Sequence, residues 1–260
     1  MGRDLYSHRP RGPDPFQAKV SRRALFGLRM SGIAEAEVDF ERAGERLLAA
    51  WDRAGHAPLQ RAAQPAAEVV AGLAQAGSGD RVLELVAGDG NVRLLVSGTR
   101  LPHEDAAFDV VVSAFGASQV PDPSLAAGEL TRVLGPGGRI VLGAWSPRGL
   151  PGGFDSVVER VGPLPQGVPA PSAWGVQGVA RERFEPHLDR LELRARTVPI
   201  RFESPDVAFE AIAGAIGLDG SGRGEARRQF DRLLASCNQS PSGVEIRARY
   251  LVVSGRVTPE

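Results

Sequence analysis

The stretch Val82-Leu-Glu-Leu-Val-Ala-Gly-Asp-Gly-Asn-Val-Arg-Leu-Leu-Val-Ser-Gly98 decides how the fold is interpreted. It begins with an apolar run typical of a buried strand and continues into the loop Gly88-Asp89-Gly90. Glycines in such a loop let the backbone approach a ligand closely, because they carry no Cβ. Asp-Gly is also a strong signal for the tight turn of a β-hairpin. The loop is therefore either a ligand-binding loop or a hairpin turn.

The residues after this loop favour the hairpin. A helix over residues 92–97 would have fewer than two turns, and β-branched Val92 and Val96 lower its propensity. A strand would place Val92, Leu94 and Val96 on one face. We therefore expect a β-hairpin over Arg81–Val96.

Composition restricts the classes of protein that the chain can belong to. Its 260 residues, 42% of them hydrophobic, are enough for one main α/β domain. Because 31 basic residues balance 31 acidic ones, no net charge attracts nucleic acid or an anionic membrane. The single cysteine, Cys237, cannot form an internal disulfide, and no Cys or His cluster has metal-ligand spacing. We expect a cytoplasmic protein without metal, nucleic-acid partner or membrane.

The N-terminal segment differs in amino-acid composition from the rest of the chain. Residues 1–37 are interpreted as a basic, partly disordered arm that precedes a domain at 38–260. Ser21–Gly27 resembles a twin-arginine export signal. Such a signal needs an apolar region after it, and here Arg29 and Glu35 interrupt that region, so we favour the cytoplasmic interpretation.

Hydrophobic periodicity predicts alternating helices and strands in the domain. Expected helices cover 40–53, 65–77, 124–134, 176–184, 206–215 and 224–236, and expected strands cover 81–86, 92–96, 108–114, 139–144, 191–202 and 245–257. This alternation indicates a largely parallel sheet with helices on its faces. Residues 146–172 are rich in Pro and Gly, and we expect a lid or binding loop there with one short helix near Phe154–Val161.

Three ordered segments carry a family resemblance. Asp80–Asn91, Leu101–Gly116 and Gly128–Pro147 resemble class I methyltransferases that depend on S-adenosylmethionine (SAM). The likeness is greatest to the small-molecule branch related to quinone-biosynthesis methyltransferases. The C-terminal segments Pro171–Gly175, Arg196–Phe202 and Tyr250–Val253 are similar to those of bacterial members. The resemblance implies a Rossmann-like fold with antiparallel C-terminal strands and a small-molecule acceptor.

The same resemblance implies which residues form the SAM site. The loop glycines would lie against the cofactor, Glu84 would receive its amino group, and residues 113–115 would form the opposite wall. Val86 occupies a position where many members have glycine, which adds bulk beside the loop. The cofactor-binding residues implied in this way are Glu84, Val86, Gly88, Asp89, Gly90, Ser113 and Phe115.

A deletion separates this chain from the family pattern. Members have a helix, a second strand ending in a ribose-binding acid and a further helix after the glycine loop. Here only ten residues, Asn91–Arg100, separate Gly90 from Leu101. The ribose-binding acid therefore has no obvious equivalent, and the nearby Glu104 and Asp105 are interpreted as caps of a solvated turn. We expect a shortened sheet.

Candidates for acceptor binding and catalysis are few. The aromatic residues Trp51, Trp145, Phe154 and Trp174 could line an acceptor pocket together with His56, although their spacing is also typical of a core. His56 and His103 are candidate bases that could help to deprotonate the acceptor, and each could equally be a surface or structural imidazole.

Two functional hypotheses remain open at this stage. The first is a SAM-dependent methyltransferase that acts on a small molecule. The second is a degenerate homologue that has lost SAM and acts as a ligand-binding protein, a non-methylating enzyme or a partner subunit. In either case the shortened sheet exposes an edge strand, and we expect residues 20–40 or a symmetric homodimer to cover it.

Overall fold

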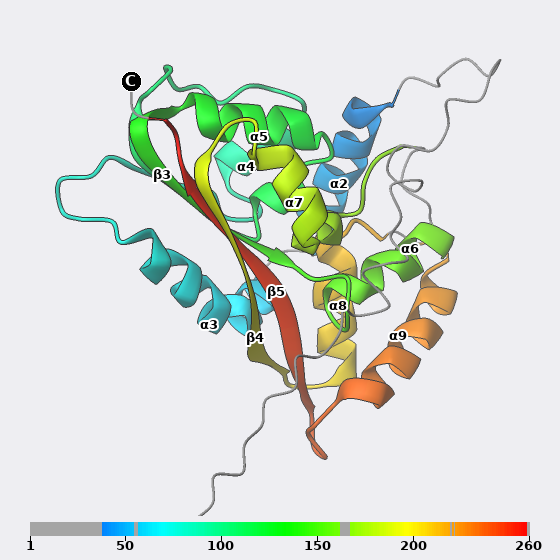
Figure 1. Ribbon diagram of the computed structural model, residues 1–260. Helices are drawn as coiled ribbons and strands as arrows, with labels where there is room; N and C mark the ends of the chain where they lie inside the picture. The colour runs from blue at the N-terminus through cyan, green and yellow to red at the C-terminus, as the bar shows by residue number, and fades with distance from the viewer. Residues whose placement is uncertain (1–37, 55–56, 162–166, 219, 221, 259–260) are drawn as a thin grey trace, which may run out of the picture. The chain divides into compact units, whose positions relative to one another are not determined.

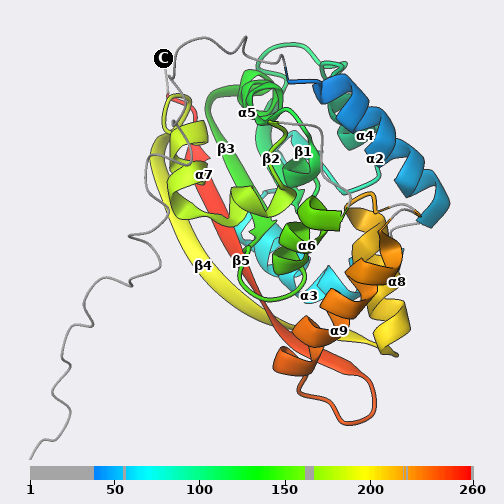
Figure 2. The same ribbon diagram turned by 90° about the vertical axis from the view of Figure 1, so that its right-hand side faces the viewer.

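A five-stranded sheet forms the centre of the fold (Figures 1 and 2). The structure is a computed structural model, and it describes residues 38–54, 57–161, 167–218, 220 and 222–258. The strands are β1 (Val82–Glu84), β2 (Phe108–Ala114), β3 (Leu134–Trp145), β4 (Asp189–Phe202) and β5 (Val244–Arg256). They lie in the order β1-β2-β3-β5-β4. The first three are parallel, and β5 runs antiparallel to both β3 and β4. The expected α/β class with antiparallel C-terminal strands is confirmed.

Helices cover both faces of this sheet. The α-helices are α2 (Phe40–Ala54), α3 (Ala57–Ala74), α4 (Gly90–Val96), α5 (Pro123–Arg132), α6 (Asp155–Val161), α7 (Gln177–Phe184), α8 (Pro205–Ala215) and α9 (Arg223–Cys237). Alternate strand residues point to opposite faces, so Val110 and Val112 join one core cluster while Val111 joins the other. Helices α3, α6, α8 and α9 contribute to the first cluster, and α2, α4, α5 and α7 to the second.

Most predicted elements exist, with shifted ends. The strand expected over 108–114 has the same bounds as β2, and the short helix expected near Phe154–Val161 is α6. Helix α3 begins at Ala57, so the prediction that Pro65 is its first residue was wrong. Proline inside a helix costs a hydrogen bond. Burial of Ala62, Ala63 and Ala66 on the sheet favours the longer helix.

The hairpin predicted over Arg81–Val96 is wrong, because residues 90–96 form α4. Asp89 is its N-cap, and its Oδ1 accepts a hydrogen bond of 2.7 Å from the Val92 amide. The buried residues Val92, Leu95 and Val96 have helical spacing, whereas the predicted strand placed Leu94 on the buried face. Packing therefore outweighs the low helix propensity of the two valines.

Helix α4 joins two neighbouring parallel strands on the same face as the next crossover helix. The chain passes from β1 through α4 to β2, and from β2 through α5 to β3. Both helices pack into the same core cluster (Figure 2). The three parallel strands therefore lie side by side in the order in which they occur in the chain, and β1 is the edge of a shortened sheet. That edge strand has only three residues. The segment that we expected to cover it is 20–40, and its residues up to 37 lie outside the described part of the chain.

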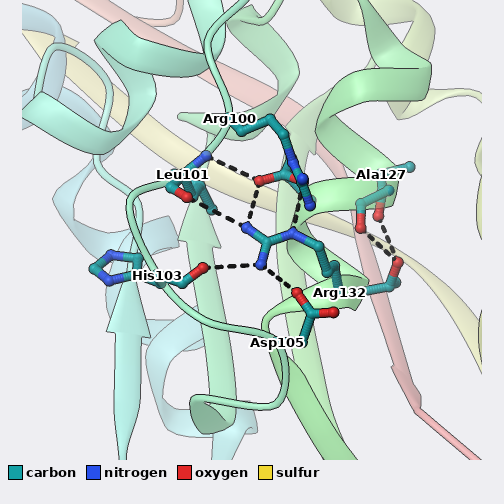
Figure 3. A network of polar contacts seen from close by, with 9 residues as sticks. Arg100, Leu101, His103, Asp105, Ala127 and Arg132 are labelled. Carbon is teal, nitrogen blue, oxygen red and sulfur yellow. Dashed lines mark hydrogen bonds and ion pairs between the residues drawn. The ribbon is translucent and has the colours of Figure 1, made fainter.

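A buried ionic network holds the connection between α4 and β2 against α5 (Figure 3). Glu129 of α5 accepts hydrogen bonds from the Leu101 amide at 2.9 Å and from Arg100 Nε at 2.9 Å. Arg132 binds the same carboxylate at 2.6 Å and also donates to the His103 carbonyl at 2.8 Å. The interpretation of Asp105 as a turn cap changes, since it pairs with Arg132 at 2.7 Å.

The charge of Glu129 is stabilised by this network. Hydrogen bonds from Arg132, and to a lesser extent from Arg100 and the Leu101 amide, lower the pKa of Glu129 to about 2, against the opposing effect of burial. The Glu129 side chain is only 6% exposed and that of Arg132 only 16%. Loss of the carboxylate would leave the buried Arg132 with Asp105, whose side chain is 80% exposed, as its remaining acid partner among the described residues.

We predict that Glu129→Gln lowers the free energy of unfolding by about 3–5 kcal/mol at pH 7, the cost of breaking a buried ion pair. Because the folded-state pKa of Glu129 is lowered, its stabilisation is present above pH 4.5 and is lost as pH falls towards 2. Urea denaturation at several pH values measures both effects.

Glu185→Gln is the matched control for this variant. Glu185 pairs with Arg181 at 3.4 Å, and both side chains are more than half exposed. Its loss should change stability by less than about 1 kcal/mol. Equal effects of the two substitutions would show that the network does not anchor the connection.

Candidate functional site

A cavity of about 240 Å³ opens at the carboxyl ends of β1, β2 and β3. We call it the strand-end cavity. It is lined by Trp51, Leu59, Gln60, Ala63, Gln64, Ala67, Glu84, Val86, Ala87, Ala114, Phe115, Gln119, Trp145 and Ala215. Helix α3 forms one wall, and the strand ends form the opposite one. Carboxyl ends of parallel strands are the usual position of ligand sites in α/β folds.

Three aromatic residues contribute flat, apolar ring surfaces to the wall of the cavity. The rings of Phe115 and Trp145 are stacked with centroids 3.9 Å apart and planes 8° from parallel. Trp51 is fixed by its indole N–H, which donates to the Ala215 carbonyl at 3.1 Å. Phe115 has a φ of 68°, in the left-handed region that non-glycine residues rarely occupy. Strained residues of this kind are concentrated at binding sites.

Two glycines make room for this arrangement. A Cβ on Gly116 would lie 2.7 Å from the Leu85 carbonyl oxygen and 3.0 Å from the Ala87 nitrogen. A Cβ on Gly143 would lie 2.9 Å from a methyl group of Val70 and 3.5 Å from the Phe115 ring. Gly116 therefore lets the end of β2 approach the end of β1, and an isolated bridge joins Val86 to Phe115 there.

The structure divides the residues that the resemblance assigned to SAM. Glu84, Val86 and Phe115 line the strand-end cavity, whereas Gly88, Asp89, Gly90 and Ser113 do not. Asp89 caps α4 and accepts a hydrogen bond from the Val86 amide at 3.0 Å. Ser113 is fully buried, donates to the Leu85 carbonyl and accepts from the Ala117 amide. Asp89 and Ser113 therefore hold the strand ends together.

The expected acceptor-pocket residues are divided in the same way. Trp51 and Trp145 line the cavity, but Phe154 and Trp174 lie in the core. Phe154 packs edge-on against Phe209 and Phe230, and Trp174 packs against Phe184. Their spacing is therefore that of core residues, the alternative recognised in the sequence.

Neither candidate base is placed on the cavity wall. His103 packs edge-on against Phe108 with ring centroids 5.0 Å apart, and its Nε2 is buried without a hydrogen-bond partner. It lies beside the network of Figure 3 and is not among the residues that line the cavity. His56 lies outside the described residues.

Sequence reasoning missed the wall formed by α3 and the residue Gln119. Ala63 and Ala67 lie four positions apart and place small side chains at the cavity, while Gln60 Nε2 donates to the Ala87 carbonyl at 3.0 Å. The polar residues at positions 60 and 64 within this alanine-rich segment indicate that one side of the helix does not face the hydrophobic core. Gln119 follows β2 in the 3₁₀ turn η1 (Ala117–Gln119), and no motif marks it.

A smaller cavity of about 20 Å³ adjoins the first and contains a buried acid. Leu59, Gln119, Trp145 and Ala215 line both cavities. Asp155 lines the smaller one and is only 7% exposed. Burial raises its pKa to about 6, although Ser172, whose amide donates at 2.7 Å, acts in the opposite direction. This carboxylate therefore changes charge close to neutral pH.

The charges around the two cavities limit the ligands that they can hold. Among the described residues that line them there is no Lys, Arg or His, and the ionisable groups are Glu84 and Asp155. No group of three or more potential metal ligands occurs in the described parts of the chain. Uncharged or cationic ligands are therefore favoured over phosphates and carboxylates.

Comparisons with known proteins agree with the motifs. Residues 58–142 match the family model described as a methyltransferase domain. Demethylmenaquinone methyltransferase of Clavibacter sepedonicus is 36% identical over 129 residues, which cover 46% of this chain and 51% of that protein. An uncharacterised protein of Mycobacterium tuberculosis is 29% identical over 166 residues, covering 49% of this chain and 61% of that protein. The matches thus span half to three fifths of these relatives.

Among solved structures, the YcgJ protein of Bacillus subtilis aligns with a TM-score of 0.47 and 15% identity, covering 76% of this chain and all of that one. Over residues 58–142 the chain therefore matches the methyltransferase-domain family. The resemblance carried by the three motif segments is thereby confirmed. No described helix is both long enough and apolar enough to cross a membrane.

We predict that Gly116→Ala lowers the free energy of unfolding by about 1–3 kcal/mol, because the added methyl group would overlap the backbone of residues 85–87. Thermal unfolding followed by circular dichroism measures this change. Gly128→Ala is the control, since its Cβ would meet no atom within 4 Å and alanine favours the interior of α5. The prediction fails if Gly116→Ala is as stable as Gly128→Ala.

We also predict that Asp155→Asn becomes more stable relative to the wild type as pH rises. Because the folded-state pKa of Asp155 is raised, the stability that its protonated form contributes is full below about pH 4 and is lost as pH rises through about 6. A raised pKa of this size corresponds to a change of about 3 kcal/mol over the whole titration, of which about 2 kcal/mol falls between pH 4.5 and 7.5. Urea denaturation at pH 4.5 and 7.5 measures it, and a constant difference would contradict the prediction.

Proposed function

We propose that this protein is a SAM-dependent methyltransferase that acts on a small-molecule acceptor bound in the strand-end cavity. The observation that carries the proposal is that motif residues Glu84, Val86 and Phe115 share one cavity with Trp51 and Trp145. Cofactor-associated positions and aromatic acceptor candidates thus meet at the same strand ends. The name of the Clavibacter relative, a demethylmenaquinone methyltransferase, supports a small organic acceptor.

The residues present fit the ammonium group of SAM. Glu84 is exposed at the cavity, and no hydrogen bond or ion pair engages its carboxylate among the described residues. It can therefore receive an ammonium group through a charge-assisted hydrogen bond. When bound, SAM would supply a methyl group on a positively charged sulfur.

The chain's own contribution would be to position the acceptor. The stacked Phe115 and Trp145 rings and the fixed Trp51 indole form rigid surfaces against which a flat molecule can pack. Holding two reactants in line can account for much of the rate of such a transfer. Apolar walls also exclude water from the reacting groups.

A second candidate, a homologue that has lost SAM and binds another ligand, is favoured by the missing nucleoside side. No residue between Ala87 and Ala114 lines the strand-end cavity. In α/β sheets a nucleotide binds in the crevice where the strand order reverses. Here β1, β2 and β3 lie side by side in chain order, so no such reversal occurs at β1. The cavity volume is also below the 300–1,000 Å³ that is usual for ligand sites.

Calorimetric titration with SAM and S-adenosylhomocysteine distinguishes the two candidates. We predict binding of both, and a loss of roughly 10- to 150-fold in affinity in Glu84→Gln, because a hydrogen bond to a charged group contributes about 1.5–3 kcal/mol. Glu104→Gln is the matched control, since this exposed carboxylate lies outside the cavity. Absence of heat and of any thermal shift at millimolar SAM would reject the first candidate in favour of the second.

A further inference from the structure

Gln119 presents an unsatisfied polar atom between the two cavities. The residue is only 8% exposed, and its Oε1 is buried without a hydrogen-bond donor in the described parts of the chain. A buried acceptor left unpaired costs about 1–3 kcal/mol. Because this oxygen belongs to a residue that lines both cavities, a ligand that donates a hydrogen bond there would remove the cost.

Asp155 lies on the far side of the smaller cavity. The Ser172 amide holds one of its oxygens at 2.7 Å, which fixes the carboxylate toward η3 (Pro171–Gly175). The smaller cavity, which both Asp155 and Gln119 line, has a volume of about 20 Å³, enough for one hydroxyl group or one water molecule. A donor that enters from the strand-end cavity would therefore reach the acid directly or through one water.

The surroundings of this space select the ligand by charge. Among the described residues that line the two cavities there is no cation to balance an anionic group. Apart from Glu84 and Asp155, the walls consist of aromatic and aliphatic side chains, the glutamines and a few small polar residues. An uncharged, flat ligand with one donor group at its end matches this arrangement.

We propose that Gln119 and Asp155 form an acceptor subsite that binds the hydroxyl group of an uncharged, flat ligand, with Asp155 as its proton acceptor. One water molecule in the smaller cavity accepts the hydrogen bond of the ligand hydroxyl and donates its own two hydrogens, one to the Gln119 Oε1 atom and one to the Asp155 carboxylate. The ligand O–H bond breaks with its electron pair left on the ligand oxygen, the proton goes to the water, and the water passes a proton to a carboxylate oxygen of Asp155. This inference rests on the proposed function, because it identifies the residue that activates the methyl acceptor.

The environment of Asp155 suits this role. Burial, the largest effect, brings the pKa of Asp155 to about 6, so the group is mainly ionised at pH 7 yet more basic than an ordinary carboxylate. Ser172 donates to it through side chain and backbone, and Glu159, one turn along α6, raises its pKa through charge repulsion. A base whose pKa lies close to the working pH is the most effective proton acceptor.

A pair of matched probes tests the binding part in the absence of SAM. 2-Naphthol donates one hydrogen bond, whereas its methyl ether, 2-methoxynaphthalene, has the same rings and donates none. We predict by equilibrium dialysis that the wild type binds 2-naphthol about 5- to 150-fold more tightly, the effect of one unpaired buried acceptor. Gln119→Met should reduce this ratio several-fold, with the remainder due to Asp155, while Gln177→Met on the exposed start of α7 should retain it.

Fluorescence of the bound probe tests the proton transfer. Excited 2-naphthol is a strong acid and emits as the anion only when an acceptor takes its proton. We predict anion emission from naphthol bound to the wild type and neutral-form emission from naphthol bound to Asp155→Asn. Lowering the pH through 6 should convert the wild-type emission to the neutral form. The Asp155→Asn protein retains a polar side chain of the same size, and its circular dichroism spectrum controls for folding.

The outcomes separate this inference from the proposed function. Equal affinity for naphthol and its ether in the wild type, or identical emission from wild type and Asp155→Asn, would overturn the subsite even if SAM binds. Selective naphthol binding with anion emission in a protein that does not bind SAM would support the subsite and reject methyl transfer.

Discussion

The short connection from β1 to β2 is the constraint on which the rest of the structure depends. Residues 85–107 form one helix, α4, and no strand of the sheet. The chain therefore crosses through α4 directly to the neighbouring strand, on the same face of the sheet as α5. Asp89 fixes the start of this helix, and the Glu129–Arg132 pair fixes the return of the chain. The same constraint makes β1 the edge of the sheet.

This constraint also determines what the site retains. The ends of β1 and β2 stay in contact through the Val86–Phe115 bridge and Gly116, so the wall that carries Glu84 is preserved. The elements that would surround a nucleoside are replaced by one seven-residue helix and a loop held by ionic contacts. Under the proposed function, acceptor binding would depend on α3 and the aromatic residues, with a polar end formed by Gln119 and Asp155.

The sequence predicted the parts of the fold in which local pattern and packing agree. The apolar run 108–114 and the antiparallel C-terminal strands follow from patterning and family resemblance. The helix at residues 90–96 was not predicted because propensity and the Asp-Gly signal favour a turn. The local capping bond of Asp89 favours a helix, and so does burial in the core, which depends on tertiary structure. Of the site, Trp51, Glu84 and Trp145 were predictable from motif and position, but Asp155 was not, because burial alone alters its chemistry.

We propose that the strand-end cavity receives the ammonium group of SAM at Glu84, whereas its described lining offers no acid for the ribose of the nucleoside. Calorimetry with two fragments tests this claim directly: S-methylmethionine carries the charged sulfonium and amino-acid groups, and 5′-methylthioadenosine carries the nucleoside. We predict that SAM and S-methylmethionine bind with affinities within about tenfold of each other, a difference under about 1.4 kcal/mol, and that 5′-methylthioadenosine does not bind. Binding of 5′-methylthioadenosine as tight as that of SAM would contradict it.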